Sequence, residues 1–267
     1  MRKRGFSLPV DGLSIRGELF LPEDTGNTRL PAVILCHGIP SGRPPAGEQS
    51  YPTLAERFCQ EGFITTAFNF RGAGRSEGNL DMLGWARDLK AILDYLWEAP
   101  EIDRRWFYLM GSSAGAAVAV YLTAQDTRIS ALITLACPAD FSFLLEQERT
   151  RSFLSQLRTT GLIKDPDFPP SLEQWRDNFF KISPIEHISK ISPRPLLLIH
   201  GELDEVVPLS HAHALFEKAQ QPKELILLPG GSHRLRLDER AVKIALQYLV
   251  KREPRDVELD PQTQERL

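Results

Sequence analysis

Short apolar runs recur along the chain, and a segment with helical spacing separates most of them from the next run. The runs are continuous rather than alternating, which is typical of strands covered on both faces of a sheet. An earlier segment, 13–22, alternates apolar and polar residues as a half-buried strand does, and Asp11-Gly12 before it is a hairpin signal. We predict the continuous strands at 31–36, 63–70, 106–110, 131–136, 195–200 and 224–228.

The intervals between these runs have helical periodicity. Apolar residues fall on one face in 51–62 and in 81–98, an alanine-rich segment follows Ser113, and 238–252 closes the series. Strands that alternate with helices indicate βαβ units. The sequence therefore predicts an α/β fold, with a mostly parallel sheet of about eight strands and helices on both faces.

One interval, 139–190, lacks a strand-like run and instead places apolar residues at helical spacing. Within it, Ser171 and Gln174 have the spacing of a capping box at the start of a helix. We expect a small helical cap lying over the sheet edge, inserted into one core formed by 1–138 and 191–267. Its aromatic residues, most of which we expect to pack the cap against the core, are Phe141, Phe143, Phe153, Phe168, Trp175, Phe179 and Phe180.

Composition narrows the class of protein. The 267 residues are 42% apolar and 25% charged with a net charge of −3, so nothing indicates binding to nucleic acid. We find neither a secretory signal nor an apolar run of membrane-spanning length. The three widely spaced cysteines, Cys36, Cys59 and Cys137, are expected to be buried free thiols, which favours the cytoplasm.

The stretch Gly-Ser-Ser-Ala-Gly at 111–115 lies between a predicted strand and a predicted helix. In that context Gly-x-Ser-x-Gly indicates a sharp turn that exposes its central serine, here Ser113. Ser112 lies outside the glycine frame and is expected to be a packing residue. The alternative for Ser113 is an ordinary helix N-cap after a glycine turn.

A serine nucleophile needs a base, and the base needs an orienting carboxylate. Of the six histidines, His233 lies in a glycine-rich loop after the last strand, whereas His211 and His213 fall in an apparently exposed helix start. Asp204, four residues past the end of a strand, is the preferred acid, and Asp140 is the main competitor.

Two further patterns are weaker. Gly72-x-Gly74 follows a strand as a dinucleotide loop does, but the full pattern requires glycine where Glu77 stands. His211-x-His213 lacks an apparent third ligand for a metal. We therefore expect neither a nucleotide nor a metal, and no cofactor.

Ser113, Asp204 and His233 occur in the chain order of the α/β-hydrolase superfamily. Together with LCHGIP (35–40), FNFRGAGRSEGN (68–79), HGELDEVVP (200–208) and GGSH (230–233), they make the whole chain resemble that superfamily, especially its small esterases and the dienelactone-hydrolase and serine-aminopeptidase-like group. The resemblance implies an oxyanion hole from the backbone N–H groups of Ile39 and Ala114, a structural role for His37, and a structural role for the loop RGAGRSEG.

We therefore expect a serine carboxylesterase that cleaves small-molecule esters with short to medium acyl chains. Thioesterase and peptidase activities would use the same three residues, and a non-catalytic receptor on this fold is a further alternative. We expect no nucleic-acid or membrane partner. The Pro/Gly-rich loop 40–49 is expected to be a surface loop, although Arg43 could meet an anionic substrate group.

Overall fold

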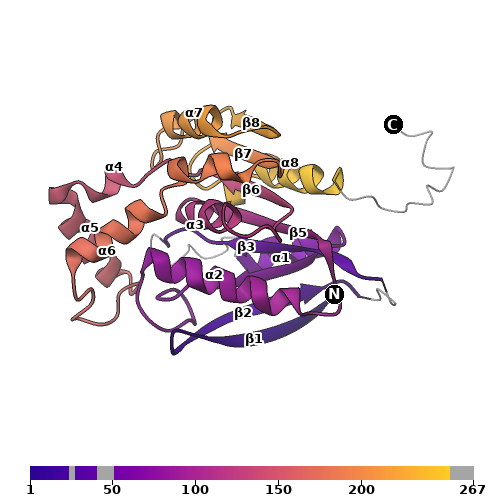
Figure 1. Cartoon of the computed structure of the whole chain (residues 1–267), viewed down its shortest axis with the longest axis horizontal. Coiled ribbons are helices and arrows are strands. Elements are labelled where there is room, and N and C mark those ends of the chain that lie inside the picture. The colour runs from indigo at the N-terminus through magenta and orange to yellow at the C-terminus, as the bar shows by residue number, and fades with distance from the viewer. Residues whose placement is uncertain (24–27, 41–50, 253–267) are drawn as a thin grey trace.

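The computed structural model describes residues 1–23, 28–40 and 51–252, and in these ranges eight strands form one twisted sheet with the order β1-β2-β4-β3-β5-β6-β7-β8 (Figure 1). All neighbouring strands from β4 to β8 pair in parallel, whereas β2 is antiparallel to both β1 and β4. The prediction of a mostly parallel sheet is confirmed. The strands are β1 (Arg2–Val10), β2 (Leu13–Leu21), β3 (Leu30–Cys36), β4 (Ile64–Phe68), β5 (Ile102–Ser112), β6 (Ala131–Leu135), β7 (Leu196–Gly201) and β8 (Lys223–Leu228).

The hairpin between β1 and β2 explains the Asp-Gly signal. Asp11 and Gly12 both have positive φ, 52° and 78°, as a two-residue turn between twisted antiparallel strands requires. The sequence did not predict β1 as a strand, because it is an edge strand whose side chains are mostly exposed and show no apolar run.

Helices cover both faces of the sheet, as predicted. One apolar core lies between the sheet and α2, α3 and α7, and a second lies between the other face and α1 and α8. The helix α3 is apolar all round because it is buried on every side. The bounds are α1 (Tyr51–Gln60), α2 (Met82–Trp97), α3 (Ala114–Thr123), α7 (Leu209–Lys218) and α8 (Glu239–Val250), with a short 3₁₀ helix at Leu235–Leu237.

The interval 139–190 is helical, and its three α-helices lie together at one end of the molecule (Figure 1). Ser171 Oγ accepts a hydrogen bond from the amide of Gln174, as a cap should. The Gln174 side chain donates to Asn178 rather than back to Ser171, so only half of the expected capping box forms. The bounds are α4 (Ser142–Leu145), α5 (Gln147–Thr159) and α6 (Leu172–Lys181), followed by 3₁₀ helices at Pro184–Glu186 and Ile188–Ile191.

This helical segment is bonded to the loop that connects β4 with α2. The indole N–H of Trp175 donates to the carbonyl of Leu80 at 2.8 Å, and the amide of Leu80 donates to the carbonyl of Leu162 at 2.9 Å. Asn178 adds a bond of 2.8 Å to the Asp81 carboxylate. Trp175 is buried, so the segment is held by apolar packing as well as by hydrogen bonds.

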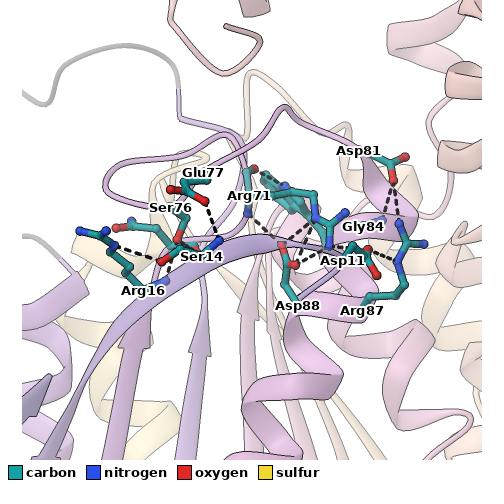
Figure 2. A network of polar contacts seen from close by, with 12 residues as sticks. Asp11, Ser14, Arg16, Arg71, Ser76, Glu77, Asp81, Gly84, Arg87 and Asp88 are labelled. Carbon is teal, nitrogen blue, oxygen red and sulfur yellow. Dashed lines mark hydrogen bonds and ion pairs between the residues drawn. The ribbon is translucent and has the colours of Figure 1, made fainter. Parts of the chain in front are cut away.

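The same loop is held by a buried ion pair (Figure 2). The Arg71 guanidinium contacts the carboxylate of Asp88 at 2.7 Å and that of Asp11 at 2.9 Å, and Arg87 also bonds to Asp11. Because Asp11 is in the β1–β2 turn and Asp88 is in α2, this cluster joins the hairpin to the helix. The Trp85 indole donates to the Arg71 carbonyl and completes the attachment.

Polar side chains of the loop bind the chain's own backbone. Glu77 accepts the amide of Ser14 at 2.8 Å, and Ser76 accepts the amide of Arg16 at 2.9 Å (Figure 2). Glu77, the residue that interrupts the dinucleotide pattern, therefore anchors the loop to β2.

Cys36, Cys59 and Cys137 are buried free thiols, as predicted. None of the helices in the described ranges combines the length and the hydropathy that a bilayer crossing requires.

Candidate active site

The point where the strand order reverses lies between β3 and β5. From β3 the chain continues to β4 on one side, and from β5 it continues to β6 on the other. The loops that leave such neighbouring strands at their carboxyl ends diverge and open a crevice. Ile39 follows β3 and Ser113 follows β5, so both predicted residues lie directly after the two strands at which the order reverses.

Ser113 is the turn residue between β5 and α3. It has φ 53° and ψ −124°, a conformation that a residue with a side chain rarely adopts. Its amide donates to the carbonyl of Leu135 at 2.8 Å, which fixes the turn against β6. Ser112, by contrast, is the last residue of β5, so the frame that the glycines define does separate the two serines.

The two glycines of the motif are required by close backbone contacts. A side chain at Gly115 would overlap the carbonyl oxygen of His37, and one at Gly111 would overlap the backbone of Ala116. The helix can therefore follow the strand directly and pack against the loop after β3. This is the physical reason for glycine at both positions around Ser113.

Gly38 packs directly against the turn. A Cβ at Gly38 would lie 3.0 Å from the Cβ of Ser113 and 3.0 Å from the carbonyl of Ser112. The backbone of the next residue, Ile39, therefore begins beside Ser113. Ala114 is the first residue of α3, and its N–H has no acceptor within the helix.

His37 has a structural position. Its ring is buried, Nδ1 donates to the carbonyl of Gly38 at 2.7 Å, and Nε2 accepts the amide of Phe70 at 3.0 Å. Burial lowers the pKa of His37 to about 4, so the ring is neutral and suits both bonds. These contacts hold the loop that carries Gly38 and Ile39.

Asp204 and His233 form a close pair across two loops. The His233 Nδ1 lies 2.9 Å and 3.0 Å from the two carboxylate oxygens of Asp204. The Asp204 side chain is fully buried, whereas 17% of the His233 side chain is exposed. The His233 ring is therefore fixed through Nδ1 by a buried carboxylate, and part of the ring remains accessible to solvent.

Close packing of glycines brings these loops together. A side chain at Gly201 would overlap the carbonyl of Gly231, so neither loop could approach the other with a bulkier residue there. The amide of Leu203 donates to that same carbonyl at 2.9 Å. A further bond runs from the His233 amide to the carboxylate of Glu205 at 3.2 Å.

The electrostatics of the pair define the proton positions. Burial alone would raise the pKa of Asp204, but hydrogen bonds from His233 and from the amides of Val207 and Val206 together lower it below its ordinary value. An ionised carboxylate only accepts hydrogen bonds, so Nδ1 of His233 carries the hydrogen. Nε2 of the neutral ring is then an acceptor, as a general base requires.

The structure does not bring every predicted residue into direct contact. In the part of the chain that the structure describes, Ser113 forms no hydrogen bond with His233. In unliganded enzymes such bonds are often long and shorten only when substrate binds. Except for Pro40, the predicted loop 40–49, including Arg43, lies outside the described residues.

Other candidate residues have different partners. Asp140 accepts bonds from the amide and hydroxyl of Ser142, the first residue of α4, and so is engaged at the start of that helix. His211 lies in the first turn of α7, as predicted, but the expected exposure was wrong: the ring is half-buried, Nδ1 accepts the amide of Ala139 at 2.9 Å, and Phe143 packs on its edge. The sequence pattern missed this because tertiary contacts with 139–143 cover the helix.

Comparison with known proteins identifies the family and the fold. The sequence profile of the family BD-FAE matches residues 18–219. YfhR of Escherichia coli O157:H7 is 28% identical over 228 residues, covering 84% of this chain and 70% of YfhR. The α/β hydrolase GrgF from Penicillium sp. sh18 superposes with a TM-score of 0.72 at 22% identity, covering 94% of this chain and 99% of GrgF. The esterase domain of a Rhodothermus marinus protein superposes with a TM-score of 0.67 at 18% identity, covering 93% and 96%.

Proposed function

Because the chain belongs to the BD-FAE family of the α/β-hydrolase superfamily, we propose that it is a serine hydrolase that cleaves carboxylic esters with short to medium acyl chains. The observation that carries the proposal is the pair of Asp204 and His233, which lies in the loops after β7 and β8 of the sheet whose β5 is followed by Ser113. A serine in the strained turn that follows a strand is the usual nucleophile of such sheets.

In the proposed reaction, Nε2 of His233 takes the proton of the Ser113 hydroxyl as the oxygen attacks the ester carbonyl. The protonated ring, stabilised by the ionised Asp204, then gives the proton to the departing alkoxide. Water repeats the sequence on the acyl-enzyme and releases the acid. Each step uses side chains of this chain alone, and we propose no cofactor.

The negative charge of the tetrahedral intermediates would be stabilised by the backbone N–H groups of Ile39 and Ala114. Two features support this assignment: the Gly38 backbone packs on Ser113, and the Ala114 amide is the first of α3, where the helix dipole favours negative charge. Loss of one such donor typically costs about 10²–10³ in rate.

The helical segment 139–190 is the proposed cap. Its Phe141 and Phe179 are buried in the core, whereas Phe180 is 38% exposed. Phe180 lines a hollow of about 440 Å³ with Leu145, Ser142, Glu146 and Arg176, and neither Ser113 nor His233 lines it. We propose that the cap limits the acyl group to short and medium chains. A p-nitrophenyl ester series from acetate to palmitate tests this, and rising kcat/KM toward palmitate would contradict it.

The experiment that tests the function compares Ser113→Ala with Ser112→Ala on p-nitrophenyl acetate and butyrate. We expect Ser113→Ala to lose at least about 10³-fold of kcat/KM, and Ser112→Ala to lose less than about tenfold. A fluorophosphonate probe should label Ser113 in the folded wild-type protein. Retention of most activity by Ser113→Ala would refute the assignment.

A panel of esters, thioesters and aminoacyl amides decides between the classes that share this chemistry. We expect the highest kcat/KM with esters. A thioester or an amide as the best substrate would transfer the proposal to a thioesterase or a peptidase. A folded protein that neither labels nor turns over any substrate would be a binding protein on the same fold.

We also propose a cytoplasmic enzyme whose partner is a small acyl ester, with no nucleic-acid or membrane partner. The buried free thiols support this, since burial raises the pKa of all three, that of Cys59 to about 11, and keeps them unreactive. Fractionation of the producing cells tests it, and recovery in a secreted or membrane fraction would contradict it.

A further inference from the structure

His200 is a buried histidine that the mechanism above does not use. It lies at the end of β7, four residues before Asp204, and only 1% of its side chain is exposed. Its Nε2 lies 2.9 Å from the carbonyl oxygen of Val207 and 3.4 Å from Oδ2 of Asp204. Its ring therefore contacts both ends of the turn 204–207.

The partners fix the hydrogen on this ring. A carbonyl oxygen only accepts, so Nε2 of His200 carries a hydrogen and donates it to Val207, while Oδ2 of Asp204 lies 3.4 Å from the same nitrogen as an electrostatic contact. Burial lowers the pKa of His200, although the bond to Val207 and the charge of Asp204 oppose the shift. The charged or titratable groups around it are Asp204, His233 and His211, and the neutral ring is a donor that adds no charge beside them.

Hydrogen bonds close the turn 204–207 at both ends. Oδ1 of Asp204 accepts the amides of Val206 and Val207 at 2.9 Å and 2.8 Å. The carbonyl of Val207 accepts from His200, so Val207 is held by Asp204 on one side and by His200 on the other. Oδ2 of Asp204 faces His200 and His233.

We propose that His200 is a positioning residue, which holds the turn and the carboxylate of Asp204 in the orientation that His233 needs. The inference rests on the proposed function, because the orientation matters only if His233 acts as a base. The chain position alone gave no sign of this role, since His200 ends an apolar run like any buried strand residue.

The test compares three substitutions. His200→Phe keeps the ring shape without a donor, His200→Gln places an amide N–H near the position of Nε2, and His200→Asn places it too close to the backbone to reach either acceptor. We expect His200→Phe and His200→Asn to lower kcat about tenfold with KM nearly unchanged, and His200→Gln to recover most of it. In His200→Phe, Oδ2 of Asp204 has only the ring of His233 to stabilise its negative charge, which favours the protonated form of that ring. The acidic limb of the pH–rate profile should therefore move to higher pH.

An observable that does not depend on turnover separates this inference from the proposed function. The Nδ1 hydrogen of His233, bonded to Asp204, should give a low-field ¹H NMR signal, and we expect it to shift or broaden in His200→Phe and His200→Asn but not in His200→Gln. His187→Phe is the control, since His187 is bonded to the Lys181 carbonyl and packs on Tyr121. In His187→Phe, the low-field ¹H signal of His233, kcat and the acidic limb of the pH–rate profile should all stay as in the wild type.

Wild-type kcat, acidic limb and ¹H signal in folded His200→Phe would overturn the inference, even if the melting temperature fell. If His200→Phe does not fold, equal kcat and equal signals in the Gln and Asn variants would overturn it. A wild-type protein without hydrolase activity would refute the proposed function, and the signal would still test the contact between His200 and Asp204.

Discussion

The carboxylate of Asp204 accepts the Nδ1–H of His233 at 2.9 Å and 3.0 Å, although the two lie 29 positions apart in the chain. The two loops meet because Gly201 and Gly231 let their backbones touch. Nothing else in the described part of the chain hydrogen-bonds to the ring of His233, so its tautomer depends on Asp204.

Asp204→Asn should therefore lower kcat on p-nitrophenyl butyrate by about 10⁴ with little change in KM, because an amide can impose the wrong tautomer on His233. Steady-state kinetics at pH 7.5 (roughly the range where a histidine base is neutral) measures this effect. Asp140→Asn is the matched control and should leave activity within about threefold of the wild type, since Asp140 bonds to Ser142 at the start of α4. Equal losses in both variants would contradict the choice of Asp204.

Gly38→Ala should lower kcat about 10–100-fold, because the added methyl would lie 3.0 Å from the Ser113 Cβ and displace the loop that carries Ile39. The melting temperature should fall only slightly, since the loop lies at the end of the sheet. Gly5→Ala is the control: its Cβ would meet nothing within 4 Å, and kcat should not change. Unchanged kcat in Gly38→Ala would show that this loop has no part in the reaction.

Asp88→Asn should lower the free energy of unfolding by about 3 kcal/mol, because it leaves the Arg71 guanidinium buried without its charged partner (Figure 2). Urea denaturation at neutral pH measures the loss. Arg87→Gln removes a side chain that is 51% exposed from the same cluster, and it should cost less than about 1 kcal/mol. Equal losses of unfolding free energy in the two variants would show that burial does not determine how much the ion pair of Arg71 and Asp88 stabilises the protein.

Stability should fall on mild acidification. A histidine in the unfolded chain binds a proton near its ordinary pKa of 6.5, whereas burial lowers the pKa of His37 in the folded protein to about 4. The unfolded chain therefore binds more protons between these values, and His37 alone should cost about 2 kcal/mol of unfolding free energy between pH 7 and pH 5. Burial lowers the pKa of His200 and His211 as well, so they act in the same direction.

Urea denaturation at pH 7, 6 and 5 measures this dependence. His37→Asn should weaken it, because that variant has no proton to bind at this position. The exposed His213 provides the control, and His213→Gln should keep the wild-type dependence. Stability that stays constant or rises toward pH 5 would contradict the buried neutral histidines.

The sequence by itself determined the sheet, because strands covered on both faces must be continuously apolar and the helices between them must have one apolar face. It also predicted Ser113 rather than Ser112 as the residue of the strand-to-helix turn, since only glycine permits the close backbone contacts found at Gly111 and Gly115. Edge strand β1 was missed because exposure on the sheet edge removes that signal.

Only the tertiary structure decided which acid lies beside His233 and what each histidine contacts. The sequence favoured Asp204 and left Asp140 as a competitor, because both follow strands and spacing alone cannot show which loop reaches the histidine. The close approach of Gly201 to Gly231 decided it for Asp204. His211 and His200 have ordinary surroundings in sequence, and their contacts with Ala139 and Val207 come from segments that meet only when the chain folds.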